Sequence, residues 1–383
     1  MTEVSFGEGF GVGTSTDGVH FTDHGYVWHG PSWWNSSLPT SRTDGKKYWE
    51  GSSAVWKAAD FNKTGRYLIN YSQMNTECKC QNITFAESFD LIHWTNGMEL
   101  GNADAYPWFN IDASLYQVGG GRWDTIYSIP VPGPGQENMR DGYPRYGYWT
   151  ASPAAGTNGT FGFGITDDGT TWTALPSPIM LPEAIGAELG AVEYVKAGVY
   201  VAMLGYGWPR TMLAYTSHSP TGPFTRSPKN VNFLNGSCYY ARFFRGPLPE
   251  QELLVTHQTW DNHGTHFSYI SPFKGVDVDD EGTFRLKWWK NNEKLKGDPL
   301  AATDAANVSQ GFLLEANFTL PSLGDSEPTQ WPGFLIETKV PGALGWSNFC
   351  FYLSFPHSCS GAAADRFSVR GDGCSRRCKH WNL

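Results

Sequence analysis

Apolar and polar residues alternate over short segments of this chain, and the three-to-four-residue spacing that marks an amphipathic helix is scarce. The alternating segments run for roughly four to eight residues, which is the usual length of a strand. Gly, Asn, Asp and Pro bound these segments, and all four residue types favour turns. The pattern predicts an all-β protein built from many short strands.

One unit recurs along the chain, and we call it the closing unit. It contains an alternating strand, a Ser/Thr-Asp-Gly turn, and then an aromatic residue and Thr. The turn residues tolerate a positive φ, so each copy is predicted to be a β-hairpin. The copies cover residues 9–28, 83–98 and 161–173, with a looser copy over 212–225.

A second unit, the opening unit, alternates with the closing unit. It starts with small or acidic residues, runs through a β-rich segment, turns, and returns on an apolar strand. Its copies run from Ser52 to Tyr71, from Asp112 to Tyr127, from Gly190 to Met203 and from Tyr239 to His257. One opening unit and one closing unit together give four strands, which make one blade of a β-propeller.

The number of units predicts five blades. There are four opening units, and five closing units when residues 267–289 close the last blade. The first closing unit has no opening unit before it, so we expect residues 1–300 to form a five-bladed β-propeller with an incomplete first blade. Either that half-blade is lost, or Met1 is not the true start. Residues 301–383 carry longer alternating strands, over 311–321 and 333–338, which predict a partial β-sandwich and an irregular tail.

The composition narrows the classes of partner. A net charge of −9 argues against nucleic acid, because proteins that bind nucleic acid carry a basic face. No segment approaches the 18 or more apolar residues of a membrane helix, so no membrane partner is expected. The chain contains 17 Trp, and 15% of its residues are aromatic, which indicates a ligand that stacks on flat apolar faces, as sugars do. We therefore expect a carbohydrate substrate and a monomeric protein.

Sequons for N-glycosylation are frequent, which favours a glycosylated protein of the extracellular space or the secretory pathway. They include Asn35, Asn62, Asn82, Asn158, Asn235, Asn307 and Asn317. The alternative is a Ser/Thr-rich β protein with accidental sequons, because the N-terminus does not resemble a signal peptide.

The seven cysteines leave at least one unpaired or the chain incomplete, and their pairing stays open. Cys374 and Cys378, with His380 beside them, superficially suggest a metal site. A disulfide-bearing tail is the favoured interpretation, so no metal and no cofactor are expected.

At four places the chain resembles the five-bladed propeller glycoside hydrolases of families 32, 68 and 43, and most of all family 32. Residues 14–21 are similar to the end of that family's first blade, and residues 48–55 to its second-blade motif Phe-Ser-Gly-Ser-Ala-Val. Residues 109–114, Phe-Asn-Ile-Asp-Ala-Ser, resemble its third-blade Arg-Asp-Pro motif. Residues 187–194 stand where the fourth blade carries Glu-Cys-Pro or Glu-Gly-Pro. A propeller followed by a sandwich is also the arrangement of family 32.

The resemblance implies roles for two carboxylates. Asp112 would stabilise the transition state, and Glu188 would be the general acid. Glu188 lies between Ala187 and Leu189, an apolar setting that favours a protonated acid. In a propeller the first strand of each blade lines the central channel, so Asp112 and Glu188 are expected to converge at one mouth, within the roughly 5–9.5 Å that glycoside hydrolysis uses. The alternative is that both are ordinary turn carboxylates.

Part of the family pattern is missing. The first-blade aspartate that serves as nucleophile or base would lie upstream of residue 9, and nothing there matches it. The chain is therefore expected to be inactive as it stands, unless Glu50 at the start of blade two replaces that aspartate. Glu193 is a rival acid, although a partner for Lys196 or Arg242 is the favoured interpretation of it.

Several residues near these carboxylates are candidates for substrate binding. Aromatic rings on predicted loops and strand starts offer stacking faces for a sugar, although blade packing explains part of them equally well. Arg242 is placed to donate to sugar hydroxyls or to orient Glu188. The predicted substrate-binding set is Trp49, Tyr106, Trp108, Tyr206 and Arg242.

The sequence thus predicts a glycosidase that hydrolyses O-glycosidic bonds, with fructosides such as sucrose or fructan as the first substrate class. A family 32 enzyme would retain the anomeric configuration, whereas a family 43-like arabinosidase or xylosidase would invert it. A non-catalytic carbohydrate-binding propeller is the alternative of a different class. It would keep the aromatic residues and lack a carboxylate pair at working distance.

Overall fold

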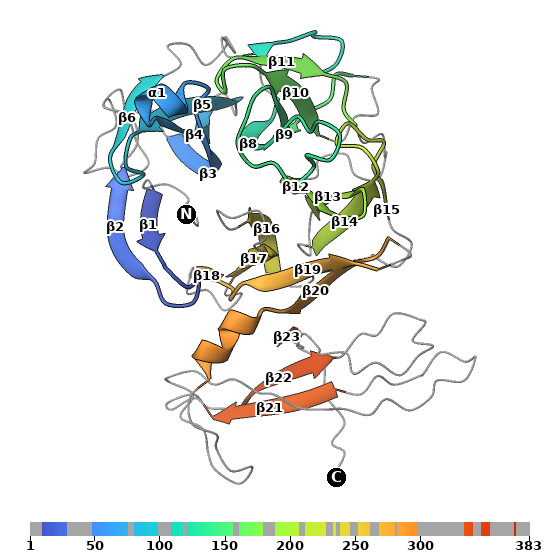
Figure 1. Ribbon diagram of the computed structural model, residues 1–383. Helices are drawn as coiled ribbons and strands as arrows, with labels where there is room; N and C mark the ends of the chain where they lie inside the picture. The colour runs from blue at the N-terminus through green and yellow to red at the C-terminus, as the bar shows by residue number, and fades with distance from the viewer. Residues whose placement is uncertain are drawn as a thin grey trace.

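The computed structural model describes sixteen segments of the chain, and every statement below concerns these segments. They are residues 10–28, 48–75, 80–98, 109–117, 121–155, 161–178, 188–206, 211–226, 233–234, 238–245, 252–260, 268–279, 282–296, 333–339, 346–352 and 371–372. The protein is all-β, and its antiparallel sheets form a propeller-like ring (Figure 1).

The first half of the ring contains a two-stranded sheet and a four-stranded sheet. The two-stranded sheet consists of β1 (Phe10–Thr14) and β2 (Thr22–Trp28). The four-stranded sheet has the order β3 (Tyr48–Lys57), β4 (Tyr67–Asn75), β5 (Cys80–Ser88) and β6 (Trp94–Met98). The short helix α1 (Phe61–Thr64) lies between β3 and β4.

Three further sheets complete the ring. The next has the order β7-β11-β10-β9-β8, with β7 (Phe109–Asn110), β8 (Trp123–Pro130), β9 (Arg145–Ala151), β10 (Gly162–Thr166) and β11 (Trp172–Leu175). The fourth contains β12 (Glu188–Lys196), β13 (Val199–Tyr206), β14 (Thr211–Ser217) and β15 (Thr225–Arg226). The fifth contains β16 (Cys238–Arg245), β17 (Leu253–Trp260), β19 (Lys274–Val278) and β20 (Phe284–Trp288), with β18 (Ser268–Ile270) paired to β17.

The cores lie between neighbouring sheets rather than within one of them. One buried cluster joins the sheets of β8 and β12, a second joins those of β12 and β16, and a third joins those of β3 and β8. The first strands β3, β8, β12 and β16 contact one another in that order towards the middle of the ring (Figure 1). The sheets of β8 and β12 are therefore packed on both faces, and a smaller cluster around Ile69 and Tyr71 lies on the β3 sheet alone.

Tryptophan packed against glycine fills the contact between the sheets of β3 and β8. The Trp123 and Trp149 rings stack with centroids 6.0 Å apart, and Trp172 meets Trp149 edge-on at 6.4 Å. A Cβ atom on Gly147 would lie 2.2 Å from the Trp172 ring, and one on Gly162 would lie 1.9 Å from Trp149. These glycines leave the space that the large rings occupy, so part of the high Trp and Gly content is explained by packing.

The predicted turns share one pattern of hydrogen bonds. In the first copy, Ser15 Oγ accepts from the amides of Asp17 and Gly18, and Asp17 Oδ1 accepts from the amides of Val19 and His20. The same pattern recurs at Ser88 and Asp90, and at Thr166 and Asp168. Hydrogen bonds from His20 hold the pKa of Asp17 well below its usual value. The repeat read from the sequence is therefore a repeated, locally stabilised turn.

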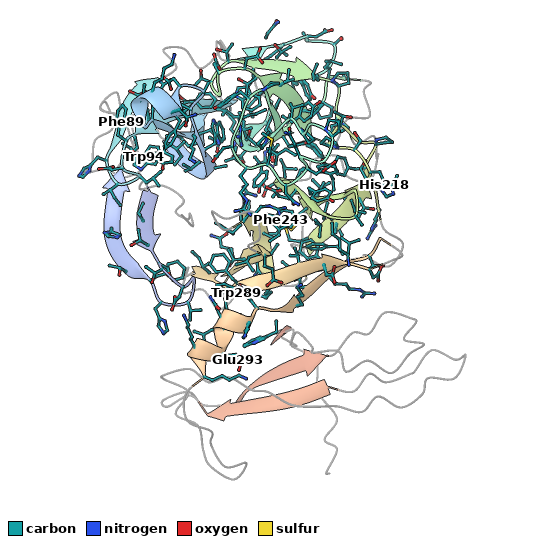
Figure 2. All side chains as sticks on the ribbon, viewed as in Figure 1. Phe89, Trp94, His218, Phe243, Trp289 and Glu293 are labelled. Atoms are coloured by element: carbon teal, nitrogen blue, oxygen red, sulfur yellow. The ribbon has the colours of Figure 1, made fainter. Side chains whose placement is uncertain are left out.

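The first hairpin is joined to the last sheet across most of the chain. Asn291 Nδ2 donates to the carbonyl of Asp17 at 3.1 Å, and Lys294 Nζ lies 3.1 Å from Asp17 Oδ2. Both residues belong to the 3₁₀ helix η2 (Lys290–Leu295), which follows β20. The Trp289 ring packs on Gly18, where a Cβ would lie only 2.6 Å away, and Figure 2 shows Trp289 where the hairpin meets the last sheet.

The structure confirms most of the predicted strands. The closing units match β1–β2, β5–β6, β10–β11 and β14–β15, and three opening units match β3–β4, β12–β13 and β16–β17. Beyond η2 the structure describes one three-stranded sheet of β21 (Gly333–Lys339), β22 (Trp346–Tyr352) and β23 (Gly371–Asp372). Residues 311–321, the other predicted sandwich strand, lie outside the described residues.

The opening unit predicted over residues 112–127 is wrong in its first half. Residues 113–115 form a turn, and Tyr116 makes only an isolated bridge with Pro153. The first strand of this sheet is β8 instead, because Trp123–Pro130 is a mostly buried strand of eight residues whereas the segment after Asp112 begins with a turn.

Crowding at Gly169 gives a test of the turn packing. Gly169 has φ +90°, and an added Cβ would lie 2.4 Å from Tyr143 Oη and 2.9 Å from Trp56 Nε1. Gly65 has a similar φ of +74° with nothing within 4 Å, so it is a matched control. Gly65→Ala should lower the free energy of unfolding by about 1–2 kcal/mol from backbone strain. Gly169→Ala should lose roughly 1–3 kcal/mol more from overpacking. Equal losses in urea titrations would contradict this packing.

Candidate active site

Two carboxylates from neighbouring sheets lie on one arginine side chain. Arg122 directly precedes β8, and its Nη2 lies 3.0 Å from Oδ2 of Asp124, the second residue of β8. Its Nη1 lies 2.9 Å from Oε1 of Glu188, the first residue of β12. The guanidinium is planar and donates in a fixed fork, so it holds the two carboxyl groups a few ångström apart.

Asp124 has an oxygen that no described residue satisfies. Its side chain is only 15% exposed, and Oδ2 is bound by Arg122. Within the described segments, its buried Oδ1 has no hydrogen-bond partner. A buried acceptor of this kind costs free energy unless water or a ligand completes it.

A third strand, β16, also reaches Glu188. The Tyr240 hydroxyl donates a hydrogen bond to the Glu188 carboxylate. Arg242 Nη1 donates to the carbonyl of Leu189 at 3.1 Å and to that of Gly190, the two residues that follow Glu188. The sequence-based suggestion that Arg242 orients Glu188 therefore has a physical basis in the backbone, since Arg242 holds the start of β12.

Asp112 lies elsewhere, so the prediction that it starts a first strand beside Glu188 is wrong. It follows β7, which pairs with β11 at the outer edge of its sheet, on the side opposite β8. Asp112 is exposed, and hydrogen bonds from Ser114 lower the pKa of its carboxyl, with the Ser114 amide donating to Oδ1 at 2.8 Å. It is a turn carboxylate, which was the alternative interpretation.

Asp124 takes the position that Asp112 was expected to occupy. The sequence contained a signal for it, because Asp124 is the acidic residue at the start of the eight-residue alternating strand Trp123–Pro130. That strand was read as the return strand of the opening unit. As the first strand of its sheet, it places Asp124 beside Glu188 as a candidate site carboxylate.

Other predicted site residues are placed only in part. Glu50 and Trp49 lie on β3 and pair with Gln73 and Met74, and Tyr206 ends β13 opposite Thr211. Nothing is described of these three side chains. Tyr106 and Trp108 lie outside the described residues. Glu50 nevertheless shares with Asp124 and Glu188 a position at the beginning of a first strand.

Glu193, the rival acid, belongs to a separate cluster further along β12. It accepts a hydrogen bond from the Tyr127 hydroxyl at 2.9 Å and lies 3.4 Å from Arg245 Nη2. Burial raises the pKa of Glu193, and the attraction of Arg245 opposes that rise. The expected partners Lys196 and Arg242 are wrong, since Lys196 pairs with Asp277 at 2.5 Å.

The described residues also bear on metal binding and on membrane insertion. Among the described residues, no group of three or more His, Cys, Asp or Glu side chains could hold a metal ion. The same part of the chain contains no helix with the length and apolar character needed to cross a membrane.

Comparisons with known proteins define the fold. No protein-family model matches the chain, and no curated protein matches its sequence. Among solved structures, fructan 1-exohydrolase IIa from Cichorium intybus has a TM-score of 0.54 at 11% identity, over 77% of this chain and 56% of that one.

Two other solved structures match at lower TM-scores. A thermostable family-43 glycoside hydrolase has a TM-score of 0.49 at 13% identity, over 79% of this chain and 90% of that one. An exo-1,5-α-L-arabinanase from a bovine ruminal metagenomic library has 0.48 at 13%, over 74% and 91%. At 11% identity, the similarity to the fructan exohydrolase shows a shared fold and no more. The chain therefore belongs to the class of β-propeller proteins.

The contribution of the Arg122 charge can be tested by measuring the free energy of unfolding of a variant that lacks it. Arg122→Met removes the only cation that the structure places on both Asp124 and Glu188 among the described residues. The free energy of unfolding should fall by roughly 1–3 kcal/mol at pH 7, less than for a fully buried pair because Arg122 is 37% exposed. The loss should shrink in 1 M salt, which screens the repulsion between the two carboxylates.

A surface pair provides the control for this measurement. Lys287 lies 2.8 Å from Glu252, and half of the lysine side chain is exposed. Lys287→Met should change the free energy of unfolding by at most about 1 kcal/mol. An Arg122→Met loss of the same size at low salt and in 1 M salt would show that the arginine stem, and not its charge, stabilises this region.

Proposed function

We propose that this protein is a glycoside hydrolase whose two working carboxyls are Glu188 and Asp124. The observation that carries the proposal is the Arg122 guanidinium, which holds both groups within hydrogen-bond distance at the starts of neighbouring first strands. Glycoside hydrolysis needs two carboxyls that flank the scissile bond, roughly 5–9.5 Å apart. Two carboxyls sharing one guanidinium lie at that scale.

Each carboxyl has a distinct task. Glu188 donates a proton to the glycosidic oxygen as the bond to the anomeric carbon breaks. Asp124 stands where the resemblance implied a transition-state stabiliser, and because nothing matches the first-blade aspartate we assign to Asp124 the task of attacking the anomeric carbon or of activating a water molecule. Its unsatisfied Oδ1 suits it for this task. Arg122 donates to Oε1 of Glu188 and so holds this carboxyl at the start of β12.

Fructosides are the proposed substrate class, with family 32 as the proposed family. The support is the resemblance of the blade motifs together with the fold shared with fructan 1-exohydrolase IIa. Arabinose- and xylose-containing glycans are the second choice. Trp49, Tyr106, Trp108 and Tyr206 remain the proposed stacking residues. In this assignment β1–β2 occupies the place of a fifth blade, and β21–β23 belongs to a β-sandwich.

Sugar release tests the two carboxyls directly. Reducing sugar would be measured after incubation with sucrose, inulin and arabinan. Glu188→Gln and Asp124→Asn should each lower the rate by roughly 10²- to 10⁴-fold, because each removes a proton-transfer or attacking group. Asp112→Asn is the matched control and should leave the rate unchanged. Loss of activity in Asp112→Asn with retention in Asp124→Asn would overturn the assignment.

Two additions sharpen the same assay. Glu50→Gln shows whether Glu50 replaces the first-blade aspartate of the family pattern, as the sequence suggested. The configuration of the released sugar, followed by NMR, separates the families, since retention is implied by the resemblance to family 32 and inversion by that to family 43.

One observation favours the non-catalytic alternative. Both carboxylates are ion-paired with Arg122, and such a pair also serves simply to join the starts of two neighbouring strands. A carbohydrate-binding propeller would then bind inulin or arabinan without cleaving it. Binding that survives in Glu188→Gln, together with no sugar release by the unaltered protein, would select this function.

We also propose that the protein is a glycoprotein of the secretory pathway. Asn62 lies exposed on α1 within the sequon Asn62-Lys63-Thr64. Protein secreted from eukaryotic cells should lose mass on treatment with peptide N-glycosidase, and Asn62→Gln should reduce that loss by one glycan. An unchanged mass in both proteins would count against the secretory assignment.

A further inference from the structure

The backbone of β16 is irregular where it passes the candidate active site. Tyr240 has φ +47°, in the left-handed region that non-glycine residues rarely adopt. The pairing of β16 with β17 shifts register between Tyr239 and Arg242, which is the signature of a β-bulge. Backbone strain of this kind costs on the order of 1–3 kcal/mol and concentrates where a side chain must be aimed.

The irregularity faces a matching one in β12. The pairing of β12 with β13 shifts register between Leu189 and Ala191, around Gly190. A Cβ on Gly190 would lie 2.8 Å from the carbonyl oxygen of Ala241, so the two strands approach as closely as glycine allows. The bulge in β16 sends the Tyr240 hydroxyl to Glu188 and the Arg242 guanidinium to the carbonyls of Leu189 and Gly190.

The Tyr240 hydroxyl is a permanent donor. Burial raises the pKa of the Tyr240 phenol well above its usual value, and the negative charges of Glu188 and Asp124 add to that rise. The phenol therefore keeps its proton at every pH at which the protein would work. The charged or titratable groups that the described segments place on Glu188 are Arg122, Asp124 and Tyr240.

We propose that Tyr240 is a positioning residue that orients Glu188 and stabilises the carboxylate that Glu188 becomes when it gives up its proton. The inference deepens the proposed hydrolase function and rests on it for the role of Glu188. In the step concerned, the O–H bond of Glu188 breaks and its proton passes to the glycosidic oxygen. The electrons of the broken glycosidic bond stay with that oxygen. Tyr240 keeps its own proton and donates to the new carboxylate, as a donor fixed in place before the charge develops.

Tyr240→Phe removes this donor and keeps the ring. We expect kcat for sugar release to fall roughly 10- to 100-fold with KM unchanged, because a hydrogen bond to a charged group is lost without loss of a substrate contact. The alkaline limb of the pH profile of kcat/KM should move to higher pH, since a donor to the ionised form of Glu188 is gone. Tyr239→Phe is the matched control and should keep the profile of the unaltered protein.

A purely structural role predicts a different result. Tyr240→Phe would then lower the melting temperature and kcat while the alkaline limb stays in place. That outcome overturns the proposal, and so does a Tyr240→Phe profile identical to that of the unaltered protein.

A second measurement does not depend on activity. In protein labelled with ¹³C-glutamate, the carboxyl resonance of Glu188 is identified by its absence in Glu188→Gln. Its titration midpoint should move to higher pH, by roughly one unit, in Tyr240→Phe but not in Tyr239→Phe. An unmoved midpoint overturns the positioning role. If the titration midpoint of Glu188 moves in Tyr240→Phe but the unaltered protein releases no sugar, Tyr240 does position Glu188. The proposed hydrolase function is then overturned.

Discussion

The ring depends on burying the faces of its sheets against one another, and the sheets of β8 and β12 are packed in this way on both faces. Apolar side chains alone would leave gaps between twisted sheets, and the chain closes one contact with tryptophan rings set against glycines. Gly147, Gly162 and Gly164 have no room for a Cβ beside Trp149 and Trp172. This packing shapes the face that the β8 sheet turns to the β3 sheet, while a separate cluster around Tyr148 and Phe163 packs its other face on the β12 sheet, which carries Glu188.

Two clusters of charged and polar groups join the first strands β8, β12 and β16. At the starts of β8 and β12, Arg122 joins Asp124 and Glu188, and Tyr240 adds a donor from β16. Further along, Tyr127, Glu193 and Arg245 join the same strands again. The second cluster satisfies its own hydrogen bonds, whereas the first leaves Asp124 Oδ1 without a described partner. This difference, rather than the presence of charge, distinguishes the candidate site from a structural cluster.

Much of the fold could be predicted because its signals are local. Turns such as Ser15–Gly18 are made by neighbouring residues, so the sequence shows them directly. The site was harder, because membership of a first strand depends on which strands pair, and pairing is not local. Asp112 precedes a short polar segment that looked like a strand start, and Asp124 lay inside a strand assigned to the wrong position. The roles of Arg122 and Tyr240 depend on contacts between sheets, which alternation along one strand does not reveal.

The contact between the first hairpin and η2 has a consequence for how the chain acquires its structure. The hydrogen-bond partners of Asp17 in this contact, Asn291 and Lys294, lie 274 and 277 residues further along the chain. During synthesis the first hairpin therefore leaves the ribosome long before its partner residues exist. Such distant contacts form late and slowly. The contact between the first hairpin and the last sheet can thus form only after η2 has been made.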